Sequence, residues 1–491
     1  MKQNRIIKKI MMISLIFAFS STTLAAGTLD LYSGNGESAY IDSMRLDSSF
    51  FEPFGMALDK DGGLIVVDSG NNLIRKIKDD KVTTIAGKCS IDESTGLPRI
   101  GFADGNTTDA MFNAPRYVAV NSKGDIFVTD TGNNAIRKIS GGKVYTFSGN
   151  GMSGYANGNA SVSRFNTPSG IAVDKDDNLY IADTMNNVIR KITPNGAVST
   201  FAGNLNGGYK DGKLTEALFN EPSDLAFDKS GNLFVVDSGN QIIRKLDSAG
   251  NVTTVAGTWK QPEEGAKYSE SGFADGKKAL FDAPKGIDIA EDGTIFISDS
   301  LNHKIRALKP SGMVVTIAGS DEFGITLGDL SKAQLNCPKD VVYSSGKLFI
   351  SDTWNNSVKV METDTKRLIG IKSMDEMTNG IKFDKNTATV QVFVNKKSLK
   401  FTDVKPVGKD GSIYVPLRLA CEALGADVEW NKETRKAIVT KDGLVTEFDS
   451  SSSSILGMNG RLLVKIRDLS TSLGLYIVWD SDHKSVLIAG E

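Results

Sequence analysis

Short apolar stretches alternate with turns rich in Gly, Asn and Asp along most of the chain, from about residue 29 to residue 370. In one copy of this pattern the apolar runs lie at residues 170–173, 179–182, 188–192 and 198–202, each bounded by such turns. Short runs rich in Val and Ile between turn residues are typical of β-strands, whereas helices need longer segments with a period of about 3.6. This part of the chain is therefore predicted to be all-β.

The pattern occurs six times, and each copy carries an Asp that is followed by Ser or Thr and, three residues after the Asp, by Asn. These marker residues recur at intervals of 53 to 62 residues and are Asp68, Asp130, Asp183, Asp237, Asp299 and Asp352. Four short strands in a repeat of about 50 residues indicate a propeller blade. The sequence thus predicts six blades.

The number of strands also predicts how the ring closes. Five repeats end in a fourth strand such as residues 198–203, but no good copy follows the sixth repeat after Met361. One surplus copy, Leu29 to Gly34, precedes the first repeat. We expect this segment to complete the last blade, because that pairing leaves no open sheet edge.

Beyond the repeats, residues 371–386 are polar and predict a linker, and residues 387–491 contain a second duplication. Residues 414–439 match residues 463–488 at an offset of 49, which aligns Trp430 with Trp479. Each half has an amphipathic pattern ended by Gly and then two strand-like runs. A small α+β domain is expected there.

The amino-terminal residues 1–26 predict a signal peptide, because Lys2, Arg5, Lys8 and Lys9 precede a short apolar run and a series of small residues. The apolar run is too short to span a bilayer. We therefore expect a secreted or cell-surface protein that has no transmembrane helix after signal cleavage and is monomeric. A net charge of −2 without a block of Lys or Arg argues against nucleic acid as a partner.

The repeated segments, such as residues 178–192 followed by residues 198–203, resemble the NHL-repeat family of six-bladed β-propellers over residues 27–370. That family includes enzymes, receptors and binding scaffolds. The resemblance therefore implies the propeller fold and a role in binding other molecules. Residues 394–401 and 414–430, with Val478 and Trp479, resemble a domain found at the amino end of some copper amine oxidases and appended to exported bacterial proteins. A copper centre of that family needs a cluster of His ligands, and this chain has only His303 and His483.

Residues that recur in every blade are expected to have structural roles. The marker Asp and the following Asn accept and donate bonds that shape a turn. The basic residue seven positions after each marker is expected to form ion pairs between neighbouring blades: Arg75, Arg137, Arg190, Arg244, Arg306 and Lys359. The alternative is a ring of carboxylates that binds Ca²⁺.

Sequence motifs for catalysis are missing: there is no nucleophile elbow, no His-Glu-x-x-His pair and no phosphate-binding loop. We assign no catalytic, cofactor-binding or metal-binding residue, and the pattern favours a protein that is not an enzyme. The rival hypothesis is a Ca²⁺-dependent hydrolase or lactonase-type propeller that uses Asp104, Asp211 and Asp275. A purely structural surface spacer is the third hypothesis.

Differences between the repeats predict a binding face. Two repeats are longer, with insertions at residues 88–100 and 258–271, and the second insertion contains Trp259 and Tyr268. Met185 and Trp354 stand where other turns have Gly, and His303 stands where they have Asn or Gln. Exposed aromatic and apolar loop residues often anchor partners, although they also serve to cover blade ends. We expect an exported binding scaffold whose face with the insertions recognises a protein, peptide or glycan at the cell envelope.

Overall fold

The computed structural model describes residues 27–363, 365, 381–383, 390–409, 412–441, 444–473, 476–480 and 484–489. These residues fall into two compact units, one up to residue 365 and the other from residue 381. The predicted signal peptide, residues 1–26, and most of the predicted linker, residues 371–386, lie outside the described residues. Each unit is considered by itself.

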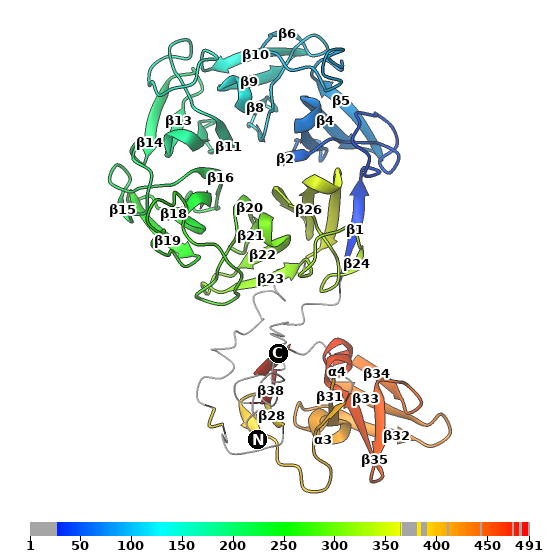
Figure 1. Cartoon of the computed structure of the whole chain (residues 1–491). Coiled ribbons are helices and arrows are strands. Elements are labelled where there is room, and N and C mark those ends of the chain that lie inside the picture. The colour runs from blue at the N-terminus through cyan, green and yellow to red at the C-terminus, as the bar shows by residue number, and fades with distance from the viewer. Residues whose placement is uncertain are drawn as a thin grey trace, which may run out of the picture. The chain divides into compact units, whose positions relative to one another are not determined.

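The first unit is a propeller of six sheets arranged around a centre (Figure 1), as the sequence predicts. From the centre outward, the first three blades are β2 (Pro53–Leu58), β3 (Leu64–Asp68), β4 (Leu73–Lys78) and β5 (Lys81–Ala86); β7 (Val118–Val120), β8 (Ile126–Asp130), β9 (Ala135–Ser140), β10 (Lys143–Ser148) and β6 (Gly105–Asn106); and β11 (Pro168–Val173), β12 (Leu179–Asp183), β13 (Val188–Ile192) and β14 (Val198–Ala202).

The other three blades follow the same order. They are β16 (Pro222–Phe227), β17 (Leu233–Asp237), β18 (Ile242–Leu246), β19 (Asn251–Ala256) and β15 (Gly212–Lys213); β20 (Pro284–Ile289), β21 (Ile295–Asp299), β22 (Lys304–Leu308) and β23 (Val314–Ala318); and β25 (Asp340–Ser344), β26 (Lys347–Asp352), β27 (Ser357–Glu362), β1 (Thr28–Ser33) and β24 (Gly328–Asp329). In every blade one 3₁₀ turn joins the second strand to the third: η1 (Ser69–Asn71), η2 (Thr131–Asn133), η3 (Thr184–Asn186), η4 (Ser238–Asn240), η5 (Ser300–Asn302) and η6 (Thr353–Asn355).

The ring closes through the first strand of the chain, so the predicted closure is confirmed. Strand β1 pairs antiparallel with β27, with Leu29 opposite Met361, and lies between β27 and β24. Leu29 is fully buried. The last blade is thereby built from both ends of the propeller sequence.

Apolar side chains from adjacent blades pack against each other and hold the ring together. Val236 and Ile243 of the fourth blade, for example, share one buried cluster with Ile287 and Ile297 of the fifth. Because each sheet is covered on both faces, its inner strands are apolar on both sides, and this explains the continuous apolar runs in the sequence.

The recurring Asp and Arg form an ion pair within each of the first five blades, as in the second. There Asp130 at the end of β8 accepts bonds from the side chains of Asn133 (2.9 Å) and Arg137 (2.6 Å), and Arg137 also reaches Asp104 at 2.7 Å. Asp130 and Arg137 are fully buried. The structural interpretation holds, but the prediction of pairs between neighbouring blades is wrong: β8 and β9 belong to one sheet, and Asp104 directly precedes the edge strand β6 of that sheet.

The second unit contains three small sheets, ordered β29-β28-β38-β37, β30-β31-β36-β35 and β32-β33-β34. Its elements are β28 (Gln391–Val394), β29 (Lys397–Ser398), β30 (Val407–Lys409), β31 (Ser412–Pro416), α3 (Leu417–Glu422), β32 (Asp427–Asn431), β33 (Lys436–Lys441), β34 (Leu444–Asp449), β35 (Ile455–Met458), β36 (Arg461–Lys465), α4 (Ile466–Leu473), β37 (Tyr476–Asp480) and β38 (Ser485–Ala489). The duplication is visible as two strand–helix–hairpin units, and their leading strands β31 and β36 pair antiparallel with each other.

Candidate binding face of the propeller

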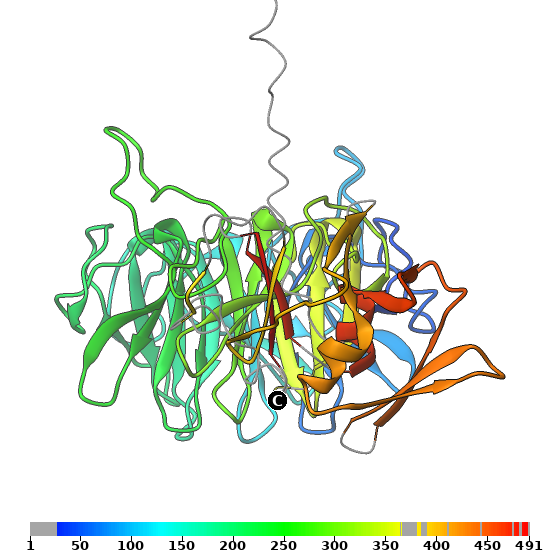
Figure 2. The ribbon, with the colours of Figure 1, turned by 90° about the horizontal axis from the view of Figure 1, so that it is seen from below.

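The six 3₁₀ turns and the long insertions share one end of the propeller, which we call the turn face. Figure 2 shows the loop that connects the first blade to the second (light blue) and the loop that connects the fourth to the fifth (green) rising above the same side of the ring. The insertion at 258–271 touches a turn directly, because the backbone N–H of Ser269 donates to the carbonyl of Gly239 in η4 at 3.0 Å. The predicted binding residues therefore lie on elements of a common face.

Three turns present an exposed apolar side chain at their middle position. These are Met185 in η3, Leu301 in η5 and Trp354 in η6, which are 43%, 45% and 52% exposed. Turns η1, η2 and η4 have Gly70, Gly132 and Gly239 at the matching position. Sequence reasoning missed Leu301, although the same comparison of turn positions identifies it.

The insertion at 258–271 packs against its blade instead of standing free. The ring of Trp259 is half-buried and stacks on Tyr209, with 4.7 Å between centroids, and Tyr209 lies over the guanidinium of Arg244 at 5.3 Å. Tyr268 is 46% exposed, and its hydroxyl donates to Glu221 at 3.0 Å. Trp259 thus holds the loop against its blade, while Tyr268 is partly exposed to solvent.

A pocket of about 560 Å³ lies beneath this insertion. Its lining includes Asn187, Tyr209, Asn220, Trp259 and Lys267. The indole N–H of Trp259 is buried and has no hydrogen-bond partner among the described residues. An unpaired buried donor carries a desolvation cost.

His303 takes part in a bond that every blade makes. Its Nδ1 accepts the backbone N–H of Cys337 from the next blade at 3.0 Å, and its ring lies 5.4 Å from that of Phe323. In the other blades the same bond is accepted by the side chains of Asn72, Asn134, Asn187, Gln241 and Asn356. Burial, then the positive charges of Lys304 and Lys339, lower the pKa of His303. The neutral imidazole therefore replaces an amide as an interblade acceptor.

At one level of the innermost strands, buried side chains alternate with Gly around the ring. Tyr117, Asp224 and Asp340 come from the second, fourth and sixth blades, and Gly55, Gly170 and Gly286 occupy the same place in the others. A Cβ on Gly286 would lie 2.6 Å from the Cα of Asp340, and one on Gly55 would lie 2.7 Å from the Cα of Tyr117. The glycines are thus required by the close approach of neighbouring strands.

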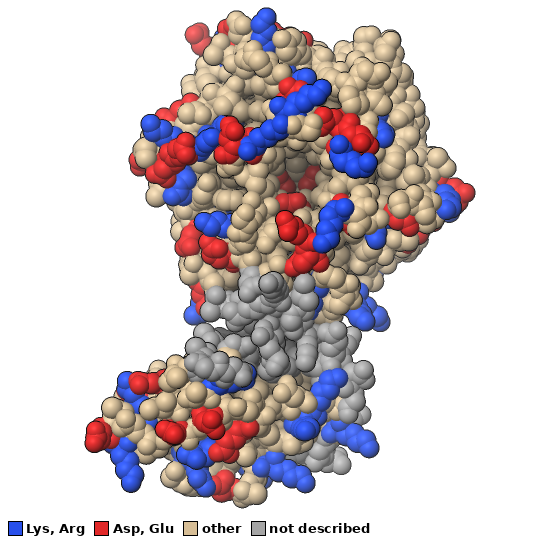
Figure 3. Space-filling model, turned by 180° about the vertical axis from the view of Figure 1, so that it is seen from behind, with Lys and Arg blue, Asp and Glu red and all other residues tan. Residues whose placement is uncertain are grey.

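Buried carboxyl groups lie in and near this layer. Asp340 accepts the backbone N–H of Met56 at 2.7 Å, and Asp224 accepts that of Ile287 at 3.0 Å. Burial, reinforced by neighbouring carboxylates, raises the pKa of both groups well above the usual value, and burial raises the pKa of Asp288 to about 6. Figure 3 shows the face opposite the turn face, where acidic side chains are visible inside a central hollow.

The carboxylates considered for a hydrolase are engaged in ion pairs. Asp104, Asp211 and Asp275 lie 2.7, 2.7 and 2.8 Å from the guanidinium groups of Arg137, Arg244 and Arg306. Within the described ranges, no group of three or more His, Cys, Asp or Glu residues is arranged to hold a metal ion. No helix in those ranges is long and apolar enough to cross a membrane.

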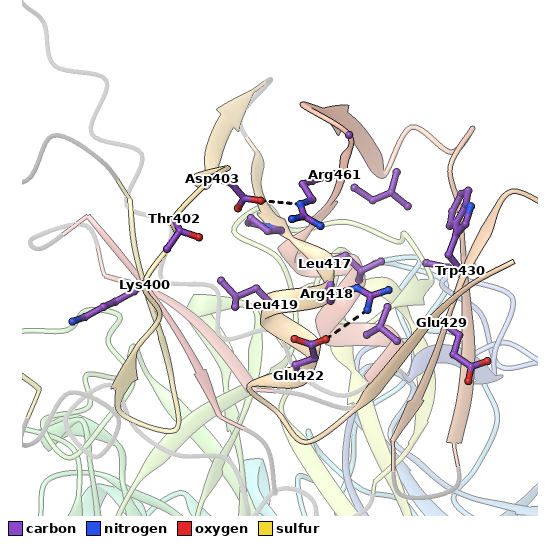
Figure 4. Close-up of a pocket in the computed structure, with 15 residues that line it drawn as sticks. Lys400, Thr402, Asp403, Leu417, Arg418, Leu419, Glu422, Glu429, Trp430 and Arg461 are labelled. Carbon is purple, nitrogen blue, oxygen red and sulfur yellow. Dashed lines mark hydrogen bonds and ion pairs between the residues drawn. The ribbon is translucent and has the colours of Figure 1, made fainter. Parts of the chain in front are cut away.

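The second unit has a groove of its own, of about 350 Å³, between α3, β32 and the start of β36 (Figure 4). Trp430, which is 42% exposed, stands at one side, and Leu417 and Leu419 contribute apolar surface. The charged residues there are largely paired: Arg461 lies 2.8 Å from Asp403, and Arg418 lies 3.8 Å from Glu422. The groove is amphipathic and carries little unbalanced charge.

Family comparisons agree with both resemblances. Residues 112–139 and 165–192 match the NHL repeat, and residues 393–457 match the copper amine oxidase N-terminal domain. The chain thus contains NHL repeats and a copper amine oxidase N-terminal domain.

Among curated proteins, the chain is 31% identical over 279 residues to Protein SUPPRESSOR OF QUENCHING 1, chloroplastic, of Arabidopsis thaliana, covering 53% of this chain and 26% of that protein. It is 27% identical over 338 residues to the human NHL repeat-containing protein 2, covering 62% of this chain and 45% of that protein. The chain therefore spans less than half the length of either relative.

Two solved structures share the fold. One is a structural genomics protein of unknown function from Bacteroides thetaiotaomicron, with a TM-score of 0.51 and 19% identity over 69% of this chain and 76% of that one. The other is an auxiliary nutrient binding protein from the same species, with a TM-score of 0.51 and 16% identity over 68% of this chain and 76% of that one.

Proposed function

We propose that this protein is a non-catalytic binding scaffold whose turn face recognises a protein, peptide or glycan. The observation that carries the proposal is the exposure of Met185, Leu301 and Trp354 at turn positions where the other blades have Gly. Blade geometry does not require a large side chain there, because three blades form the same turn without one. Exposed apolar side chains on a rigid frame are a common means of partner recognition.

Recurring polar residues of the blades support a binding role over a catalytic one. The marker carboxylates and the outer Asp104, Asp211 and Asp275 are occupied in ion pairs with the Arg residues of their blades. A hydrolase that uses Ca²⁺ needs carboxylate oxygens free to bind the ion. The name of one structure with the same fold, an auxiliary nutrient binding protein, is in keeping with a ligand-binding role.

We further propose that the protein acts outside the cytoplasm, as a secreted or envelope-associated molecule. Residues 1–26 have the charge and hydropathy pattern of a secretory signal. The copper amine oxidase N-terminal domain at residues 393–457 supplies a second module. The groove beside Trp430 gives this module a candidate binding surface of its own.

The proposal is tested by capture of envelope or secreted material from the cells that produce the protein. A triple variant, Met185→Gly, Leu301→Gly and Trp354→Gly, carries at each position the residue that the other turns use. We expect it to fold as the parent does and to lose the captured partner, because truncating a buried anchor costs about 2 kcal/mol or more. The matched control is Lys175→Ala with Asp176→Ala, two exposed residues on the opposite face. Loss of capture in the control but not in the triple variant contradicts the proposal.

A further inference from the structure

Three of the six innermost strands carry a cation at the same position, directly after the Pro that leads into the strand. These are Arg116, Lys285 and Lys339 in the second, fifth and sixth blades. The other blades have Phe54, Ser169 and Ser223 there. A blade therefore does not need a cation at this position, so blade packing gives no reason for the three that are present.

The three cations come from innermost strands that approach one another at the centre of the ring. The Tyr117 hydroxyl, next to Arg116 in the chain, donates to the backbone carbonyls of Lys285 at 3.1 Å and Lys339 at 3.3 Å. One tyrosine thus reaches from the second blade to the fifth and sixth. The layer that contains Tyr117 lies farther from the turn face than the cations, since each strand starts at the turn face and the cation precedes the layer residue. Two of the cations lie against turns of the turn face, because the Lys285 amine donates to Ser238 of η4 and the Lys339 amine lies 5.8 Å from the ring of Trp354 in η6.

None of these cations forms an ion pair with a carboxylate in the part of the chain that the structure describes. Lys285 donates to the hydroxyl of Ser238 at 2.9 Å, and Lys339 contacts the sulfur of Cys337 at 2.9 Å. The Arg116 guanidinium lies 5.4 Å over the ring of Phe54. This contrasts with the buried Arg residues of the blades, which are all paired with Asp.

The nearby acids do not supply the missing negative charge. Glu221 acts on Arg116 and Lys285 from a distance, but its carboxylate binds Lys267 and Tyr268. Asp224 and Asp340 in the layer below have pKa values raised well above the usual range by burial, so their charged forms are disfavoured.

The positive charges also disfavour one another. Burial, then the charges of Lys339 and Arg116, lower the pKa of Lys285 to about 8. Burial likewise lowers the pKa of Arg116. A negative group placed among them would relieve this cost, because opposite charge favours the protonated form of Lys.

We propose that Arg116, Lys285 and Lys339 form a binding site for an oxyanion, a carboxylate or phosphoryl group, at the centre of the turn face. Arg supplies a planar fork that matches two oxygens of such a group, and the lysines supply mobile donors. Trp354, whose ring lies 5.8 Å from the Lys339 amine, connects this site to the apolar residues of the face. The inference rests on the proposed function in that the ligand enters from the same face.

Small anions test the site without the partner, so failure here is distinguishable from failure of the scaffold proposal. Citrate, inorganic phosphate and, as a reference anion, chloride are titrated into the full-length protein at constant ionic strength, with binding followed by calorimetry and thermal unfolding. We expect saturable binding of citrate or phosphate over chloride. A preference for citrate identifies a carboxylate ligand, and a preference for phosphate identifies a phosphoryl ligand.

The variant Arg116→Ser with Lys285→Ser carries the residue that the third and fourth blades have at this position. We expect its anion affinity to fall tenfold or more, because hydrogen bonds to charged groups are lost. Lys123→Ser, at an exposed position in a turn of the opposite face, is the matched control and should bind as the parent does.

A second readout requires no variant. At pH 8, anion binding should be accompanied by proton uptake, because it raises the pKa of Lys285, and calorimetry in buffers of different ionisation enthalpy measures that uptake. Binding that is equal in the double Ser variant and the parent, or no binding of either anion above chloride, overturns the proposal.

Discussion

At the scale of single residues, the sixth blade shows how the buried Arg cluster changes when Lys replaces the Arg. In the second blade Arg137 binds Asp104 and lies 5.0 Å from the ring of Phe102. In the sixth blade the Arg is Lys359, and the residue before the edge strand is Leu327. Lys359 lies 3.9 Å from the marker Asp352 and is without the second carboxylate. The third blade has Asn157 at the outer position, where it accepts a bond from Arg190 at 2.7 Å, so a second carboxylate is not required even where Arg is present.

Replacing Arg137 by Lys should destabilise the propeller substantially. Arg137 satisfies two carboxylates and the carbonyls of Ala103 and Met111, and a single ammonium cannot reach this set. We expect a loss of about 3 kcal/mol, at the lower end of the cost of breaking a buried pair, measured as a lower midpoint of thermal or urea unfolding. The reverse change, Lys359→Arg, is the control and should alter stability little. Equal midpoints for the parent and Arg137→Lys would show that the fork is dispensable.

His303 should make stability depend on pH in a way that Asn does not. Its pKa is lowered in the folded protein, so unfolding takes up a proton and stability falls as pH drops below the ordinary His value of about 6.5. Protonation also removes the acceptor for the Cys337 N–H. His303→Asn keeps an acceptor, as in the other blades, and should flatten the pH dependence of stability between pH 7 and 5.

The unfolding midpoint measured across this pH range checks the prediction. The only other histidine, His483, provides the control substitution His483→Asn. If both variants follow the parent curve, the imidazole does not carry the interblade bond.

At the scale of elements, the sequence is sufficient to predict the strands and the ring closure, because both follow from a repeated local pattern. Leu29 to Gly34 was recognisable as a surplus fourth strand, and β1 (Thr28–Ser33) fills that place. The half-buried position of Trp259 was not predictable, since it depends on Tyr209, which lies in another segment. The proximity of Arg116, Lys285 and Lys339 likewise depends on ring closure. It cannot be predicted from the sequence of one repeat, because each residue comes from a different blade.

Removal of residues 28–34 should open the last blade. The deletion exposes the edge of β27 and uncovers the apolar surface that Leu29 buries. We expect a lower unfolding midpoint and faster proteolysis within residues 340–362, compared with a protein that begins at Gly27. Identical unfolding and cleavage in the two proteins would contradict closure by β1.

At the scale of the whole molecule, the chain consists of a propeller and a second unit with a core of its own. In the second unit, Val415, Leu417, Cys421, Val439 and Val464 belong to one buried cluster. We expect residues 387–491 to fold alone, because this cluster draws on both halves of the duplication. A dispersed amide NMR spectrum of that fragment supports independence, and a collapsed spectrum contradicts it.

Sequence comparison alone leads to the prediction that the turn face binds a partner, but it does not identify the chemistry of that face. Met185, Leu301 and Trp354 all depart from Gly in the sequence, whereas their exposure and the paired state of Asp104 become evident only with side chains in place. The family resemblance supplies the fold and leaves the ligand open, because propellers with NHL repeats serve several functions.

The most direct test of the central claim is amide hydrogen exchange on the propeller with and without its captured partner. The account predicts slower exchange at residues 88–100 and 258–271 and in the turns that contain Met185, Leu301 and Trp354. Exchange at the opposite-face turns, residues 174–178 and 193–196, should be unchanged. Protection confined to those opposite-face turns would contradict recognition through the turn face.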